Sequence, residues 1–295
     1  MTPRRCTGRR RADARRLGAL AALCGALWLA ACGSPAGPPQ NPAQRNASTL
    51  AQAGARAWAR GDATQAAALY ERALSAAESV EDFELAGAML LNLALVQGAG
   101  GDLAGAQARV DRIVAAPQRY GAPLVARASA RKALLYLDAP DLDAALDWTE
   151  RAQAACAAPC ALDATLANLR AHVALQRGDA PAALQWATQG VARADEHGAE
   201  RANALRLSGQ AQRQLGQHDA ASSAFAQALA IDRQLGLSER VALDLLGAAD
   251  NEAARGAAAA AREFYQRALD VYSAAGNVRA ADGVRQRLAA LGAQR

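Results

Sequence analysis

The chain has 295 residues, of which 52 % are apolar, 21 % are charged and only 4 % are aromatic. Its 33 basic and 28 acidic residues give a net charge of +5, but the segment 1–31 alone holds seven arginines and one aspartate. The remaining 26 basic and 27 acidic residues nearly balance, which excludes a nucleic-acid binder that depends on a basic surface.

The N-terminal segment has the layout of an export signal. Its seven arginines lie between Arg4 and Arg16, and the segment 17–31 follows without a charge. These fifteen residues are too few for an ordinary membrane-spanning helix, which needs about 20. A positive head, a short apolar segment and small residues before a break are typical of a cleaved signal peptide. The pair Arg15 and Arg16 would also fit twin-arginine export, although no matching residues follow it.

The apolar segment ends in Leu29, Ala30, Ala31 and Cys32, which resemble the lipobox of bacterial lipoproteins. This resemblance implies that residues 1–31 are a signal peptide and that Cys32 is lipidated. Cysteine suits the role because a thiolate is the side-chain nucleophile that takes up lipid readily. In that family an aspartate after the cysteine retains the product in the inner membrane, so Gly33 implies the periplasmic face of the outer membrane. The alternative is a plain secretory signal in which Cys32 is incidental.

The next segment, residues 32–46, is expected to be the lipidated cysteine and a tether. It is rich in proline, glycine and asparagine, which favour a semi-extended chain over a helix. We expect one folded domain after it, over residues 47–292.

Six similar segments follow from residue 47 onward. Their turns start at positions 61, 101, 140, 178, 216 and 256, so the interval between successive turns is nearly constant. A fixed period of this kind indicates a solenoid of repeated supersecondary units. The chain is rich in alanine, which favours helices, and no alternating strand pattern is present. We therefore expect an all-α fold.

Each segment fits two helices joined by a short turn. A glycine at most turn starts supplies a positive φ and ends the first helix. The next residue is often an aspartate that can cap the second helix, as at Asp62, Asp102, Asp141 and Asp179. Small residues let the paired helices approach, and a large residue nine positions after the turn start fills the gap between units, as at Tyr70, Val110, Phe225 and Tyr265.

This pattern resembles the tetratricopeptide repeat (TPR) over about residues 47–275. Gly54, Ala66, Tyr70 and Ala73 match it in unit one, whereas unit three has Thr149 and unit four has Ala187 at the large position. The resemblance implies a right-handed α-α superhelix of about six two-helix repeats. Residues 277–291, with Val284, Leu288 and Leu291 apolar, are expected to form a C-terminal capping helix.

No catalytic or metal-binding constellation is evident. The three histidines, His172, His197 and His218, lack a metal-ligand partner at useful spacing, and no nucleophile, phosphate-binding or dinucleotide motif occurs. Cys156 and Cys160 are spaced closely enough for a disulfide in an exported protein. A thiol-disulfide activity of this pair is the alternative. We expect no enzyme activity, no cofactor and no metal.

The resemblance also implies a concave groove lined by the first helix of each unit. In this chain the groove is expected to be apolar in the first repeat units and polar to basic in the middle units. The candidate peptide-binding residues are Arg127, Arg131, Asn168, His172, Asn203, Arg206, Gln210 and Arg213. Amide and guanidinium groups suit an extended peptide, because they bond its backbone and its carboxylates. The alternative is that these are ordinary solvated residues of a helix.

These features predict a lipid-anchored adaptor that binds a protein or an extended peptide in its groove, contacts the membrane through its lipid anchor and binds no nucleic acid. It is similar to the TPR lipoproteins that assist assembly of pili, secretins and other envelope complexes. The alternative is an accessory regulator of a cell-wall enzyme.

Overall fold

The computed structural model describes residues 41–139 and 141–293. The expected signal peptide, Cys32 and most of the expected tether lie outside these residues. Residues from Pro42 onward form one compact unit. None of the helices in the described part of the chain is both long and apolar enough to cross a membrane.

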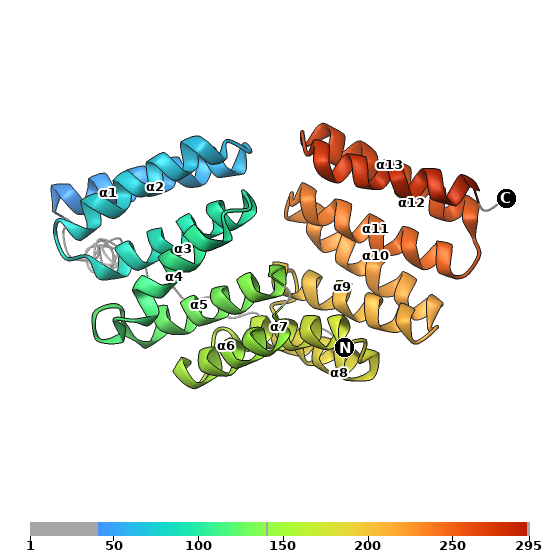
Figure 1. Cartoon of the computed structure of the whole chain (residues 1–295), viewed down its shortest axis with the longest axis horizontal. Coiled ribbons are helices and arrows are strands. Elements are labelled where there is room, and N and C mark those ends of the chain that lie inside the picture. Colours follow the sequence, from blue (N-terminus) through green and yellow to red (C-terminus); the bar gives the residue numbers. More distant parts are fainter. Residues whose placement is uncertain (1–40, 140, 294–295) are drawn as a thin grey trace, which may run out of the picture. The chain divides into compact units, whose positions relative to one another are not determined.

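The described residues form thirteen helices and no strand, which confirms the all-α prediction. Six consecutive pairs, α1/α2 to α11/α12, form hairpins, and α13 follows the last one (Figure 1). The helices are α1 (Pro42–Ala59), α2 (Ala63–Glu78), α3 (Phe83–Ala99), α4 (Leu103–Val114), α5 (Pro117–Asp138), α6 (Leu142–Ala155), α7 (Asp163–Gln176), α8 (Ala180–Arg193), α9 (Ala199–Gln214), α10 (His218–Gln234), α11 (Ser238–Ala254), α12 (Ala258–Ala274) and α13 (Val278–Ala293).

The predicted start of the domain, at residue 47, was too late. Helix α1 begins at Pro42, so residues 42–46 belong to the first helix and not to the tether. Proline is tolerated in the first turn of a helix because its missing N–H has no partner there in any case. The proline-rich composition of the preceding residues therefore extended the predicted tether too far into the chain.

The predicted aspartate caps and glycine turns inside the repeats are confirmed. The carboxylates of Asp62, Asp102, Asp141 and Asp179 each accept a hydrogen bond from a backbone N–H in the first turn of α2, α4, α6 and α8. Gly61 and Gly178 have φ values of 80° and 75°, which favour glycine over any residue with a side chain. Helix α5 differs from the others, because Gly121 has non-helical φ and ψ and Pro123 follows it, so the helix is broken near its start.

Large side chains fill the spaces left by small ones. A Cβ atom on Gly54 would lie 2.7 Å from the Tyr70 ring, and one on Gly209 would lie 2.9 Å from the Phe225 ring. Both rings are buried. These two contacts explain why a small residue in the first helix accompanies a large one in the second. In unit three Thr149 is fully buried, and its hydroxyl donates to the Ala145 carbonyl.

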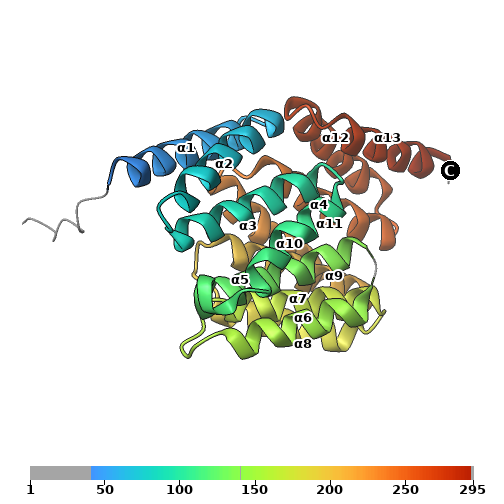
Figure 2. The ribbon, with the colours of Figure 1, turned by 60° about the vertical axis from the view of Figure 1, so that its left-hand side comes forward.

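The stacking of the hairpins identifies the concave face. Successive hairpins lie side by side in chain order (Figures 1 and 2). Each odd-numbered helix from α1 to α9 also contacts the next odd-numbered helix, whereas the even-numbered helices have no comparable contacts with one another within the described chain. The layer whose members lie closer together is the inner layer of a curved stack. The first helices of the repeats therefore line the concave face, as predicted.

Candidate functional site

The central cavity of the concave face is lined only by odd-numbered helices. It has a volume of about 230 Å³. Leucines from α5, α7 and α11 alternate there with polar side chains from α7, α9 and α11. The lining residues are Leu134, Thr165, Asn168, Leu169, His172, Glu200, Asn203, Arg206, Arg240 and Leu243. Four of the predicted groove residues thus meet in one cavity: Asn168, His172, Asn203 and Arg206.

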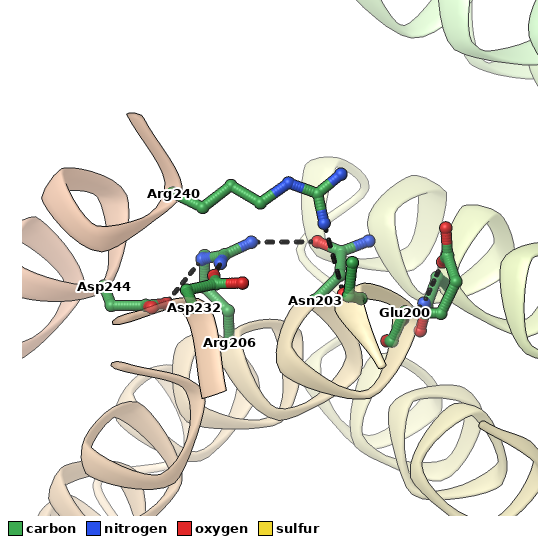
Figure 3. A network of polar contacts seen from close by, with 8 residues as sticks. Glu200, Asn203, Arg206, Asp232, Arg240 and Asp244 are labelled. Carbon is green, nitrogen blue, oxygen red and sulfur yellow. Dashed lines mark hydrogen bonds and ion pairs between the residues drawn. The ribbon is translucent and has the colours of Figure 1, made fainter. Parts of the chain in front are cut away.

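Arg206 is committed to the protein itself, which corrects its predicted role. Its side chain is only 7 % exposed, and its Nε donates to Asp244 Oδ1 at 2.7 Å. The other end of the guanidinium forms an ion pair with Asp232 and donates to Asn203 Oδ1 at 3.1 Å (Figure 3). Arg206 therefore links α9 to α10 and α11 and leaves little of its guanidinium for a ligand.

The two aspartates around Arg206 have unusual electrostatics. Both side chains have 0 % exposure, and one guanidinium can neutralise only one of the two carboxylates. Burial raises the pKa of Asp244 from 3.8 to about 7, the charge of Arg206 opposes this shift, and the nearby Asp232 adds to it. Burial and the nearby Asp232 therefore both favour the protonated form of Asp244, whereas Arg206 favours the carboxylate.

Asn168 is also engaged inside the solenoid. It is 3 % exposed, and its Nδ2 donates to the Glu200 backbone oxygen at 3.0 Å and to Glu200 Oε2 at 2.9 Å. These bonds tie α7 to the start of α9. Asn168 thus lines the cavity as a structural residue. Because its amide nitrogen already donates to Glu200, that nitrogen does not serve the predicted role of bonding a peptide backbone.

A second cavity continues the concave face toward the C-terminus. It has a volume of about 140 Å³ and contains two predicted groove residues, Gln210 and Arg213. Leu243 lines both cavities, so together they form one groove, which we call the α9–α11 groove. Among the described residues Arg213 forms no ion pair, and its Nε is buried without a partner. At the far end Asp250 accepts hydrogen bonds from Arg287 at 2.6 and 2.7 Å and from the Tyr265 hydroxyl.

Arg127 and Arg131 lie outside the α9–α11 groove. Both belong to α5, where Arg127 is exposed and Arg131 is half-buried, and neither lines either cavity. Both lie on the helical face of Leu134, which Arg131 precedes by one turn and Arg127 by two turns. The basic middle of the groove predicted from sequence is therefore not a single cluster.

Two groove residues were missed by the sequence analysis. Arg240 lies across the Arg206 ion-pair network, and its guanidinium donates a hydrogen bond to the Ala199 backbone oxygen at 3.1 Å (Figure 3). Leu243 is 42 % exposed, and among the described residues Leu215 and Leu235 are the other leucines exposed to a similar degree. Leu243 occupies in unit six the repeat position that Asn203 has in unit five. Extending the same mapping by one repeat would have found it.

The remaining predicted residues lie elsewhere. The structure joins Cys156 and Cys160 in a disulfide between α6 and α7. His197 is exposed in the turn before α9, and the Nδ1 of His218 lies 2.9 Å from Asn251 Oδ1. Within the part of the chain that the structure describes, no group of three or more His, Cys, Asp or Glu residues could hold a metal ion.

A larger cavity lies away from all of the predicted site residues. It measures about 580 Å³ and is lined mainly by helix ends and turns, including Trp58, Gly100 and Ala275. Arg60 lies in its wall, but the guanidinium donates to Gln65. The α9–α11 groove, although smaller, brings together more polar side chains and is the better candidate site.

Comparison with known proteins supports the fold. A scan against protein-family models and a search of curated protein sequences found no match. Among solved structures, the chain is similar to one in the APC/C hetero-tetramer Cut9-Hcn1, with 15 % identity and a TM-score of 0.61. That similarity covers 82 % of this chain but only 43 % of the other, so this protein spans less than half of its length.

Two further structures have the same architecture. A Rap protein complexed with Competence and Sporulation Factor has 13 % identity and a TM-score of 0.58, covering 84 % of this chain and 77 % of the other. A signal-transduction ATPase with a tetratricopeptide repeat sensor, from Pyrococcus horikoshii, has 13 % identity and a TM-score of 0.55. It covers 75 % of this chain and 34 % of the other. The fold is that of a TPR solenoid, as the sequence predicts.

Proposed function

We propose that this TPR solenoid is an adaptor that binds an extended segment of a partner protein in the α9–α11 groove. The observation that carries the proposal is an exposed apolar side chain, Leu243, on a concave face between two arginines that have no carboxylate partner among the described residues, Arg240 and Arg213. Unpaired guanidinium groups attract carboxylates, and an exposed leucine favours an apolar side chain. The partner segment is therefore apolar at its centre and acidic on its flanks.

The shape of the groove supports an extended ligand. Its two cavities follow one another along α9 and α11 and meet at Leu243. The amides of Asn203 and Gln210 line this path and can bond the backbone of a peptide. A Rap protein of the same fold is complexed with Competence and Sporulation Factor. We assign the groove a binding role without a catalytic step.

The groove is tested by capture of partners from an envelope extract. The bait is residues 33–295, which include the whole compact unit, and a second bait carries Arg213→Glu and Arg240→Glu. A partner retained by the first bait and lost from the second supports the groove. The matched control is Arg127→Glu, which reverses an exposed arginine outside both cavities. Equal retention by all three baits would place the contact on another face.

We further propose that Cys32 anchors the protein by lipid to the periplasmic face of the outer membrane, where it serves assembly of an envelope complex such as a pilus or a secretin. The support is the sequence around Leu29–Cys32 and the arginine-rich segment before it. Several acyl chains give a stable anchor, whereas one alone is marginal. Cys32→Ala is expected to abolish labelling by a fatty-acid analogue and to release the protein from membranes. Continued labelling of this variant would refute the anchor.

A further inference from the structure

The network beneath the α9–α11 groove has more carboxylates than cations. Asp232 comes from α10 and Asp244 from α11, and both bond the single guanidinium of Arg206 from α9. Each carboxylate also has a buried oxygen without a partner, namely Asp232 Oδ1 and Asp244 Oδ2. A buried acceptor without a donor is costly. A single proton on this pair would supply a donor and would remove the excess negative charge.

No other charged group described near Asp232 and Asp244 neutralises the second carboxylate. Arg240 lies one helical turn before Asp244 on α11, but its described hydrogen bond goes to the Ala199 backbone oxygen. Glu200 bonds Asn168 and adds a negative charge to the same cavity. The titratable groups that line this cavity, that act on Asp244, or that interact electrostatically with Tyr272 beside Arg206 are His172 (α7), Glu200 and Arg206 (α9), Asp232 (α10), Glu239, Arg240 and Asp244 (α11), Tyr272 (α12) and Arg287 (α13).

The position of the network couples it to the groove. Arg206 is part of the wall of the central cavity, and Arg240, which borders the same cavity, crosses above it (Figure 3). A carboxylate bound at Arg240 would therefore lie close to Asp232 and Asp244. With both aspartates ionised, the network of three groups has a net charge of −1 and repels that carboxylate. With one of them protonated, the network is neutral.

We propose that Asp232 and Asp244 share one proton in the folded protein and that an acidic ligand in the α9–α11 groove binds preferentially to this protonated form. The inference rests on the proposed function of the groove. The proton comes from solvent and forms a carboxyl O–H on one aspartate, which can donate to the other. By reciprocity, ligand binding increases proton occupancy, and the affinity for an acidic ligand increases as the pH falls. The groove thus binds its partner and a proton together.

The shared proton is tested without any ligand. Infrared spectra of residues 33–295 are recorded at pH 6 in H2O and D2O, and the spectrum of Asp244→Asn is subtracted. The expected result is a protonated-carboxyl C=O band in the wild-type protein that is lost in the variant. Asp195→Asn removes an exposed aspartate and is expected to keep the band. Absence of the band from the wild-type protein would overturn the inference.

The linkage is tested with a defined probe. The probe is a fluorescein-labelled, end-blocked pentapeptide with leucine at its centre and two acidic residues on each side. We expect it to bind about tenfold more tightly at pH 5.5 than at pH 8, the effect of one unit charge at roughly 10 Å in the effective dielectric of a protein surface. Asp244→Asn is expected to abolish this difference, and a control peptide with asparagine and glutamine in place of the acids is expected to lack it.

The variants separate this inference from its alternatives. His172 lines the same cavity, and a histidine also changes charge in this range of pH. If the pH difference persists in Asp244→Asn and disappears in His172→Asn, the histidine is responsible and the inference is wrong. Equal binding at both pH values would refute the linkage but leave the groove intact. If the peptide does not bind at pH 5.5 or at pH 8, both the proposed groove function and the linkage are refuted.

Discussion

The replacement Asp244→Asn removes one of the two carboxylates that share Arg206. Asparagine has the same shape and retains an oxygen that can accept the hydrogen bond from Arg206 Nε, which is 2.7 Å long in the structure. The remaining Arg206–Asp232 ion pair is neutral. The variant therefore tests the excess charge of the network with little change in packing.

The expected effect depends strongly on pH. Burial raises the folded-state pKa of Asp244 to about 7, above its ordinary value of 3.8. Between these values the folded protein holds a proton that the unfolded chain has released, so the wild-type protein loses stability as the pH rises through this window. Each pH unit is worth about 1.4 kcal/mol, so the loss between pH 4.5 and pH 8 is about 3 kcal/mol. The variant lacks this group and does not lose that stability.

The measurement is urea denaturation of both proteins at several pH values between 4.5 and 8.5, followed by far-ultraviolet circular dichroism. We expect the stability of Asp244→Asn relative to wild type to increase by about 3 kcal/mol across this range. The comparison cancels titration of groups common to both proteins. Asp195→Asn is expected to follow the wild-type profile, because Asp195 is exposed. Parallel profiles for wild type and Asp244→Asn would show that Asp244 remains ionised throughout.

Two other substitutions test the packing and the ion pairs. Arg206→Met is expected to destabilise the protein at pH 8 by about 3–5 kcal/mol in urea denaturation, because it leaves two buried carboxylates unpaired; a loss below about 1 kcal/mol would mean that the network is hydrated. Gly209→Ala is expected to lower stability by about 1–3 kcal/mol because its methyl group would lie 2.9 Å from the Phe225 ring. Its control, Gly283→Ala, meets nothing within 4 Å and is expected to stabilise α13 by about 0.5–1 kcal/mol; equal effects at both glycines would contradict the packing argument.

The features that could be predicted from sequence are those that repeat. The turn glycines, the capping aspartates and the small–large pairs such as Gly54 with Tyr70 recur at nearly the same spacing from unit to unit, so each occurrence supports the others. Local rules are sufficient here, because a cap or a positive φ depends on a few neighbouring residues. The start of α1 at Pro42 was missed because a proline before a repeat fits both a tether and a first helical turn.

The role of Arg206 could not be predicted in the same way. Its repeat position correctly places it at the concave face, but its partners, Asp232 and Asp244, belong to two other helices. No local sequence pattern indicates that carboxylates of other helices will neutralise an arginine of the groove. One signal was present: Asp244 interrupts the otherwise apolar run Val241–Leu246, where a carboxylate needs a partner. Such a residue indicates a buried network, although it does not identify the cation.

The position of an arginine within the repeat therefore determines the face of the solenoid on which it lies. Its ion pairs with other residues of the protein determine whether it can bind a ligand. Arg206 and Arg213 lie two helical turns apart on the same face of α9, but only Arg206 has carboxylate partners among the described residues. In the proposed function, recognition of an acidic ligand therefore falls to Arg240 and Arg213, on either side of Leu243, and not to Arg206. In the proposed linkage one proton changes the charge of the Asp232–Arg206–Asp244 network beneath these arginines, so the affinity of the α9–α11 groove would depend on residues that the ligand does not contact.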